Sequence, residues 1–336
     1  MKLNRDGARR RMKQSLAAVA AAVLLAACGG GDRLSDFKPV RVIAFGDESS
    51  VLDDSAEAGN ARKYSVNPVF SATVDCHTKP NWVQYVAEYY RLYFPQCSKG
   101  LPAGTPTPSL MLAAPNASVA DVKARIDAFL ASDALSSRDL VTVYVGVHDV
   151  LNQYAAVKAG GDRAAALAAA EAAGALLATQ VNRLADAGGR VLLVFLPGME
   201  YSPFAAAEEQ AMPGAAALLK QLTQGFNQGL LEIYPDGRKI GVALLDGTVE
   251  SISRERDDPE YGGSYYDYAF DFPVNRSACL EANRTPNLLT CTSATAVSAA
   301  TNRTDRWLWA DDTHLSASGQ GVLGDLALRI ATENPF

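Results

Sequence analysis

The chain has 336 residues, of which 48% are hydrophobic, and its formal net charge is −6. This length is enough to bury the core of one large α/β domain. The acidic balance argues against a nucleic-acid partner, because binding to phosphates depends on clustered basic residues.

The first 27 residues have the features of a secretory signal peptide. Residues 1–13 carry six lysines and arginines and one acid, and residues 16–27 form an apolar run. This run is shorter than the ~20 apolar residues that cross a bilayer as a helix. A basic start, a short apolar core and small residues before the cleavage point predict export. These residues carry a net charge of +5, so their removal changes the formal charge from −6 to −11.

The apolar run ends in the sequence Leu25-Ala26-Ala27-Cys28. This sequence resembles the lipobox of bacterial lipoproteins, which implies cleavage after residue 27 and lipidation of Cys28. The alternative is an ordinary signal peptide with a chance cysteine. Gly29 replaces the aspartate that retains some lipoproteins at the inner membrane, which favours the outer membrane. We therefore expect an extracytoplasmic, lipid-anchored protein with a flexible tether over residues 28–39 and one domain over residues 40–336.

Four cysteines remain after cleavage, and export places them in an oxidising compartment. Four cysteines allow three pairings, of which we favour the local one, Cys76 with Cys97 and Cys279 with Cys291. Metal binding is the rival interpretation. The spacing contains no CxxC pair and the chain has three histidines, so we predict no metal site and no cofactor.

Short β-branched segments alternate with long helical patterns along the domain. The predicted strands are residues 40–45, 140–145, 190–196 and 240–245, and the predicted helices are residues 81–94, 119–131, 164–187, 206–234 and 315–332. Residues 250–310 read as irregular, and no apolar segment after the signal reads as a transmembrane helix. Near-continuous apolar strands between helices predict a three-layer αβα fold with a parallel sheet. In such a sheet, ligands bind at the carboxyl ends of the strands.

Three polar motifs stand at these strand ends or before the last helix. They are Phe45-Gly46-Asp47-Glu48-Ser49-Ser50, Gly146-Val147-His148-Asp149 and Asp311-Asp312-Thr313-His314. In this order they resemble the motifs of the SGNH/GDSL hydrolases: Gly-Asp-Ser-x-Ser, Gly-x-Asn-Asp and Asp-x-x-His. The resemblance extends from about residue 40 to the C-terminus. It implies a flavodoxin-like sheet and an esterase, lipase or carbohydrate deacetylase that acts on a small-molecule, lipid or glycan ester.

The last motif matches the family unchanged. The resemblance implies that His314 is the general base and that Asp311 orients it, and a neutral imidazole suits that role near pH 7. The first motif departs from the family, because Glu48 stands where the nucleophilic serine is expected. In one interpretation the turn slips by one residue, so that Ser49 attacks the ester. In another, Glu48 and His314 activate water. In a third, the site is degenerate, and Ser49 and Ser50 only cap the next helix.

The oxyanion site also departs from the family pattern. The resemblance implies donors from the first motif, here at Gly46 and Asp47, and from an asparagine that His148 replaces. A histidine can still donate one N–H, although it can equally be a buried structural residue. A second-motif glycine is missing, and Ala113, Ala114 or Asn116 can supply its N–H, with Ala114 as our choice. The leading prediction is ester hydrolysis by Ser49, His314 and Asp311. The runner-up is an inactive lipoprotein of this fold that binds a ligand or partner.

Overall fold

A computed structural model describes residues 37–70, 73–234, 239–257, 276–279, 287–297 and 306–333. The predicted signal peptide, the predicted lipidation site at Cys28 and most of the predicted tether lie outside these residues. Residues 37–336 form one compact unit.

The centre of this unit is a five-stranded parallel sheet in the order β4-β1-β5-β6-β7. Its strands are β4 (Leu110–Met111), β1 (Arg41–Gly46), β5 (Asp139–Tyr144), β6 (Arg190–Val194) and β7 (Ile240–Ala243). In chain order this is the 2-1-3-4-5 arrangement of flavodoxin-like folds. The parallel αβα architecture predicted from the sequence is therefore confirmed. All six residues of β5 are buried, as expected for a strand that helices cover on both faces.

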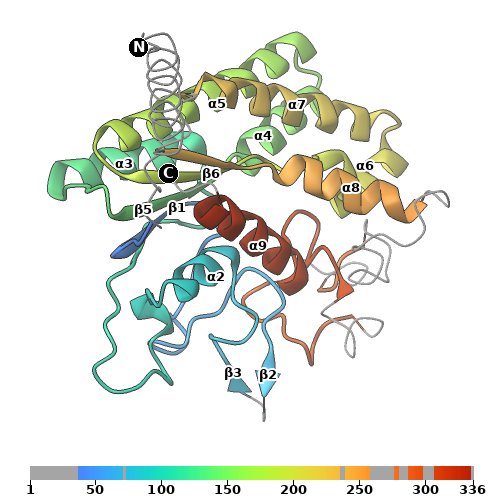
Figure 1. Cartoon of the computed structure of the whole chain (residues 1–336). Helices are drawn as coiled ribbons and strands as arrows, with labels where there is room; N and C mark the ends of the chain where they lie inside the picture. Colours follow the sequence, from blue (N-terminus) through green and yellow to red (C-terminus); the bar gives the residue numbers. More distant parts are fainter. Residues whose placement is uncertain are drawn as a thin grey trace, which may run out of the picture. The chain divides into compact units, whose positions relative to one another are not determined.

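Helices cover the two faces of the sheet unequally (Figure 1). One face carries α3 (Val119–Ser132), α4 (Val147–Lys158), α5 (Arg163–Asp186) and α7 (Ala215–Gly229), and the other carries α2 (Trp82–Tyr89) and α9 (Ala317–Glu333). The remaining elements are α6 (Pro203–Ala211), α8 (Leu245–Asp257), the antiparallel pair β2 (Val69–Phe70) and β3 (Thr73–Val74), and the 3₁₀ turns Pro95–Cys97, Met199–Tyr201 and Leu230–Glu232. Residues 250–257, predicted as irregular, lie in α8, so that part of the prediction is wrong.

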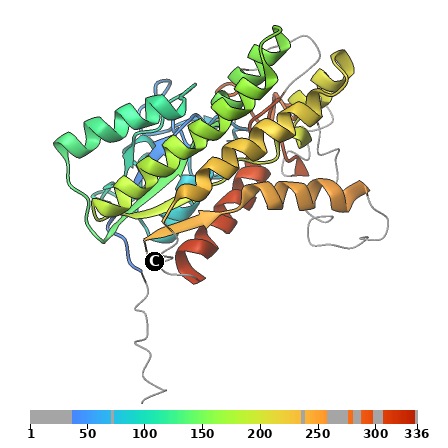
Figure 2. The same cartoon turned by 90° about the horizontal axis from the view of Figure 1, so that it is seen from above.

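Helix α5 is the one described helix that is long and apolar enough to cross a membrane. It runs beside α7 over the sheet (Figure 2). The two backbones meet at Gly174 and Gly229, where an added Cβ would lie 2.0 Å from the Phe226 carbonyl oxygen and 2.1 Å from that of Glu171. The small residues of α5 therefore serve close helix packing, which explains its apolar composition without a membrane.

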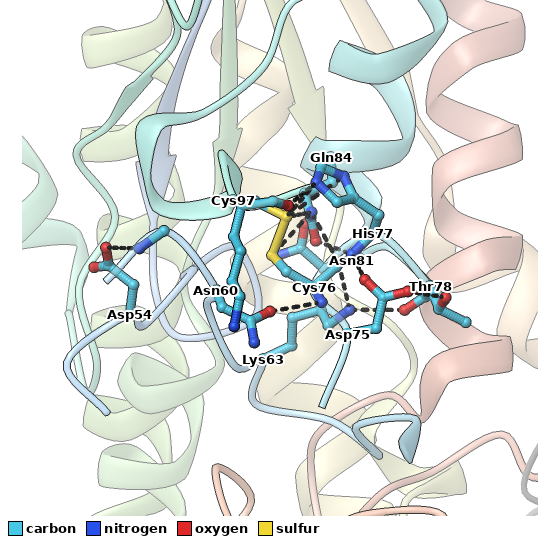
Figure 3. The surroundings of a disulfide bond; sticks show 12 residues. Asp54, Asn60, Lys63, Asp75, Cys76, His77, Thr78, Asn81, Gln84 and Cys97 are labelled. Atoms are coloured by element: carbon cyan, nitrogen blue, oxygen red, sulfur yellow. Dashed lines mark hydrogen bonds between the residues drawn. A yellow bond between two sulfur atoms is a disulfide. The ribbon is translucent and has the colours of Figure 1, made fainter. Parts of the chain in front are cut away.

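Both predicted disulfides are present and follow the local pairing, Cys76 with Cys97 and Cys279 with Cys291. The first lies beside a buried lysine (Figure 3). Lys63 is 1% exposed, and its Nζ donates to the carbonyl oxygens of Cys76, Thr78 and Lys79, each at 3.0 Å. The ammonium thus joins three carbonyls of the turn that leads into α2.

Candidate active site

The polar motifs converge where the strands end. Glu48 follows β1, His148 lies in the first turn of α4 after β5, and His314 precedes α9. Gly46 makes the sharp exit from β1 possible, since it has a φ of +152° and an added Cβ would lie 2.2 Å from the Tyr144 carbonyl oxygen. The N–H of Asp47 then donates to that same oxygen at 3.1 Å. Gly46 and Asp47 therefore shape the turn that presents Glu48.

Asp311 and His314 form the pair that their spacing predicts. The Nδ1 atom of His314 lies 2.9 Å and 2.8 Å from the two carboxylate oxygens of Asp311. Asp311 Oδ1 also accepts hydrogen bonds from the backbone N–H groups of Thr313 and His314, at 2.9 Å and 2.7 Å. The carboxylate is thus fixed by its own loop and sets the orientation of the imidazole.

Glu48 contacts the ring nitrogen of His314 that Asp311 does not contact. Its Oε1 lies 2.7 Å from Nε2 of His314 and 2.7 Å from Nε2 of His148. Its Oε2 accepts a hydrogen bond from the backbone N–H of Asn116 at 2.8 Å. The residue is 4% exposed, so three donors hold a buried carboxylate.

This geometry fixes the protonation of His314. Both ring nitrogens face carboxylates, and a carboxylate oxygen only accepts, so the ring donates from both sides as an imidazolium. Burial alone would lower the pKa of His314, but Asp311 and Glu48 outweigh burial and raise this pKa to about 10. Burial would raise the pKa of Glu48, but the hydrogen bonds from His148 and His314 hold it well below its ordinary value. The resting site therefore contains an anionic Glu48 and a protonated His314.

The pKa of His148 is also raised, chiefly by its hydrogen bond to Glu48. A ring nitrogen that donates N–H to a carboxylate cannot at the same time ligate a metal ion. Within the described ranges, no group of three or more His, Cys, Asp or Glu residues could hold a metal ion.

Ser49 does not take the position proposed for a slipped turn. Its N–H donates to Asp47 Oδ1 at 3.0 Å and its carbonyl accepts from Gln320 Nε2 at 3.3 Å. Among the described residues, no hydrogen bond joins the Ser49 hydroxyl to His314. Glu48 fills that place, so the geometry does not support the one-residue slip. The capping alternative is also wrong, because residues 47–50 form a turn and no helix begins there.

The assignment of the second-motif N–H to Ala114 is wrong. The Ala114 N–H donates to the Gly46 carbonyl at 3.0 Å and so extends the pairing of β1 with its neighbour. The N–H that faces the site belongs to Asn116, which has a φ of +58°. Asparagine tolerates this left-handed conformation better than most residues do. The sequence analysis included Asn116 among three possible donors, but only the path of the backbone in the structure shows which N–H contacts Glu48.

No protein-family model matches the chain, and no curated protein matches it. Solved structures do resemble it. A member of the lipolytic G-D-S-L family from Veillonella parvula is 12% identical, with a TM-score of 0.39 over 86% of this chain and 97% of the other. An acetylxylan esterase from Geobacillus stearothermophilus is 15% identical, with a TM-score of 0.39 over 90% and 97%. The acetyl xylan esterase AlAXEase is 14% identical, with a TM-score of 0.39 over 85% and 97%. At such identities, the reaction of this chain has to be inferred from its own residues.

Proposed function

We propose that the protein is an exported, lipid-anchored hydrolase of carboxylic esters, of the esterase, lipase or carbohydrate deacetylase kind, in which Glu48 replaces the usual serine. One observation carries this proposal: the His314 imidazole bridges Asp311 and Glu48 through contacts of 2.8 Å and 2.7 Å. This is the order of an orienting acid, a proton-transfer group and an attacking group in a catalytic triad. The carboxylate of a glutamate can act as a nucleophile that forms a covalent intermediate. It can also act as a general base that takes a proton from water.

The export part of the proposal rests on the lipobox-like sequence before Cys28 and on the two disulfides, which persist in oxidising compartments. Its test is metabolic labelling with a radioactive fatty acid. We expect label on the wild-type chain and none on Cys28→Ser, and labelling of Cys28→Ser would contradict lipidation at this residue. Separation of the inner and outer membranes then tests the predicted location.

The activity is tested with p-nitrophenyl acetate and longer p-nitrophenyl esters. We expect His314→Ala and Glu48→Gln each to lower kcat/KM at least ~10²-fold, the scale of losing a general acid–base group. His77→Ala is the matched control, since this histidine lies beside the Cys76–Cys97 disulfide (Figure 3) and bonds to Glu88. Among the described residues, no hydrogen bond or ion pair joins it to the site. If Ser49→Ala alone abolished hydrolysis, Ser49 and not Glu48 would be the attacking group.

A second candidate function is ligand binding without catalysis. The observation in its favour is that the donors from Asn116, His148 and His314 are all bonded to Glu48, so none of these three is free for a substrate oxyanion. Absence of ester hydrolysis in the wild type, together with strong hydrolysis in Glu48→Ser, would favour this candidate over the first.

A further inference from the structure

The shape of the Glu48 side chain matches that of an acylated serine. In an acyl-serine, the carbonyl carbon is joined to Cβ through one atom, Oγ, and in glutamate the carboxyl carbon Cδ is joined to Cβ through one atom, Cγ. Residue 48 stands where the family places its serine, so Glu48 Cδ stands where the acyl carbon of such an intermediate would be. Its oxygens face Asn116 N–H, His148 and His314.

From this arrangement we propose that Glu48 is a covalent nucleophile and that water completes the reaction at the carboxyl carbon of Glu48 itself. This inference rests on the proposed ester hydrolysis and states by which chemical steps the ester is cleaved. In either route, attack on the ester forms an oxyanion on the substrate, away from the donors that hold Glu48. Only in the covalent route does a second tetrahedral centre form, at Cδ of Glu48 itself. If the intermediate is bonded to Glu48, these donors already face the carbon that becomes tetrahedral, which is the placement that stabilises an oxyanion.

The first step forms a mixed anhydride. A carboxylate oxygen of Glu48 bonds to the acyl carbon of the ester, and the bond from that carbon to the alcohol oxygen breaks. The departing alkoxide takes the Nε2 proton of His314 and leaves as the alcohol. His314 is protonated in the resting site because its two nitrogens face Asp311 and Glu48, so it begins the cycle as the acid.

The second step uses the imidazole that the first step leaves neutral. His314 takes a proton from water, and the water oxygen bonds to Cδ of Glu48, with Asn116 N–H and His148 as oxyanion donors. Collapse breaks the bond from Cδ to the bridging oxygen and releases the substrate acid as a carboxylate. Glu48 is then a carboxylic acid with one oxygen from water, and it loses its proton to solvent. The released acid carries an oxygen that belonged to Glu48.

The test follows oxygen atoms in the full-length wild-type chain. Enzyme in excess over p-nitrophenyl acetate reacts once in H₂¹⁸O and is digested, and the peptide containing Glu48 is analysed by mass spectrometry. We expect heavy oxygen in Glu48 close to one atom per ester cleaved, and unlabelled acetate. The internal control is Glu88, a half-buried carboxylate that contacts His77 outside the site and should stay unlabelled.

The failures of the two proposals are distinguishable. Ester cleavage with all heavy oxygen in acetate and none in Glu48 overturns the proposed attack of water at Cδ of Glu48, while ester hydrolysis itself stands. No cleavage of p-nitrophenyl acetate, with Glu48 unlabelled, overturns both. Equal label in Glu48 and Glu88 identifies spontaneous exchange and also overturns the inference.

Discussion

Glu48 and His314 are joined by a contact of 2.7 Å between Oε1 and Nε2, although the two residues lie 266 positions apart in the sequence. This contact makes the site an ion pair before any substrate arrives. A protonated imidazole cannot accept the proton of a serine, so under the proposed function the Asp311–His314 pair starts as an acid and not as a base.

Glu48→Ser should convert the site to serine chemistry. Asp311 and Glu48 both raise the pKa of His314, and the substitution removes the second of these carboxylates. It also frees the Asn116 N–H and His148 to bind an external oxyanion. Donors of this type contribute about 10²–10³-fold to kcat, so we expect kcat/KM on p-nitrophenyl acetate to rise by at least ~10²-fold.

The measurement for Glu48→Ser is best made beside Ser49→Ala/Glu48→Ser, which excludes the neighbouring hydroxyl. A burst of p-nitrophenol equal to the enzyme concentration would report acylation of the new serine. If kcat/KM stayed at the wild-type level and no burst appeared, the donors around residue 48 would not form an oxyanion site.

The sequence predicted the four long strands well because most of their residues are apolar, as burial on both faces demands. It missed β4, since a strand of two residues has no pattern of its own, and it missed α4. That helix starts directly at Gly146, whose φ of +129° turns the chain without a polar cap. The start of α4 therefore lacks the side-chain cap that marks many helices, and an acidic residue in its first turn, Asp149, is the remaining local signal.

The convergence of the candidate side chains was predictable from the sequence. The spacing and motif positions of Asp311, His314 and His148 predicted that these residues meet, and the structure brings them together around Glu48. The sequence did not select Asn116 as the backbone donor, because every residue except proline has a backbone N–H. The sequence also left open whether Glu48 or Ser49 contacts Nε2 of His314. The backbone course of residues 47–50, directly after β1, decides between them.

Asp47 should make stability fall with rising pH. It is 1% exposed, and its Oδ1 accepts the Ser49 N–H. Its Oδ2 is buried, with no hydrogen-bond partner in the part of the chain that the structure describes. Burial, with a further contribution from Glu48, raises the pKa of Asp47 to about 7, against the opposing effects of Ser49, His314 and His148. The folded protein thus holds a proton that the unfolded chain releases near its ordinary carboxyl pKa. The stabilising contribution is complete below that pKa and is lost as pH rises to about 7.

Asp47→Asn is the matched variant, since its amide oxygen can still accept the Ser49 N–H. The free energy of unfolding of the wild type should fall relative to the variant by on the order of 3 kcal/mol between about pH 4 and pH 8. Urea denaturation across this range measures the difference. Parallel curves for the two proteins would show that Asp47 does not hold the proton.

Lys63→Met should destabilise the fold although it replaces a charge with an apolar chain of similar length. Burial lowers the pKa of Lys63 to about 8, yet its ammonium is the donor to three carbonyl oxygens. Methionine fills the space and leaves those carbonyls without this donor, at about 1–3 kcal/mol for each buried group that stays unsatisfied. We expect a loss of at least ~2 kcal/mol in urea denaturation. Lys79→Met is the control, because Lys79 is an exposed lysine of the same turn. An equal loss of unfolding free energy in both variants would contradict a specific role for the Lys63 ammonium.

Loss of the Cys279–Cys291 disulfide should weaken activity as well as stability. The N–H of Cys279 donates to the Ala310 carbonyl at 2.7 Å and that of Ala278 to the Trp309 carbonyl at 3.0 Å, directly before Asp311. The N–H of Ala310 in turn donates to the His314 carbonyl at 2.7 Å, which closes the loop that holds the Asp311–His314 pair. The disulfide closes a loop with a sequence separation of 12, and one of this size is worth about 3 kcal/mol.

The double variants Cys279→Ser/Cys291→Ser and Cys76→Ser/Cys97→Ser separate the two effects. Both should lower the melting temperature, because the second disulfide closes a loop of comparable size, with a sequence separation of 21. Only the Cys279/Cys291 variant should also lower kcat at a temperature where both proteins remain folded by circular dichroism, since its disulfide supports the loop of His314. An equal fall of kcat in both variants would mean that the disulfides act on the fold as a whole and not on the position of the histidine.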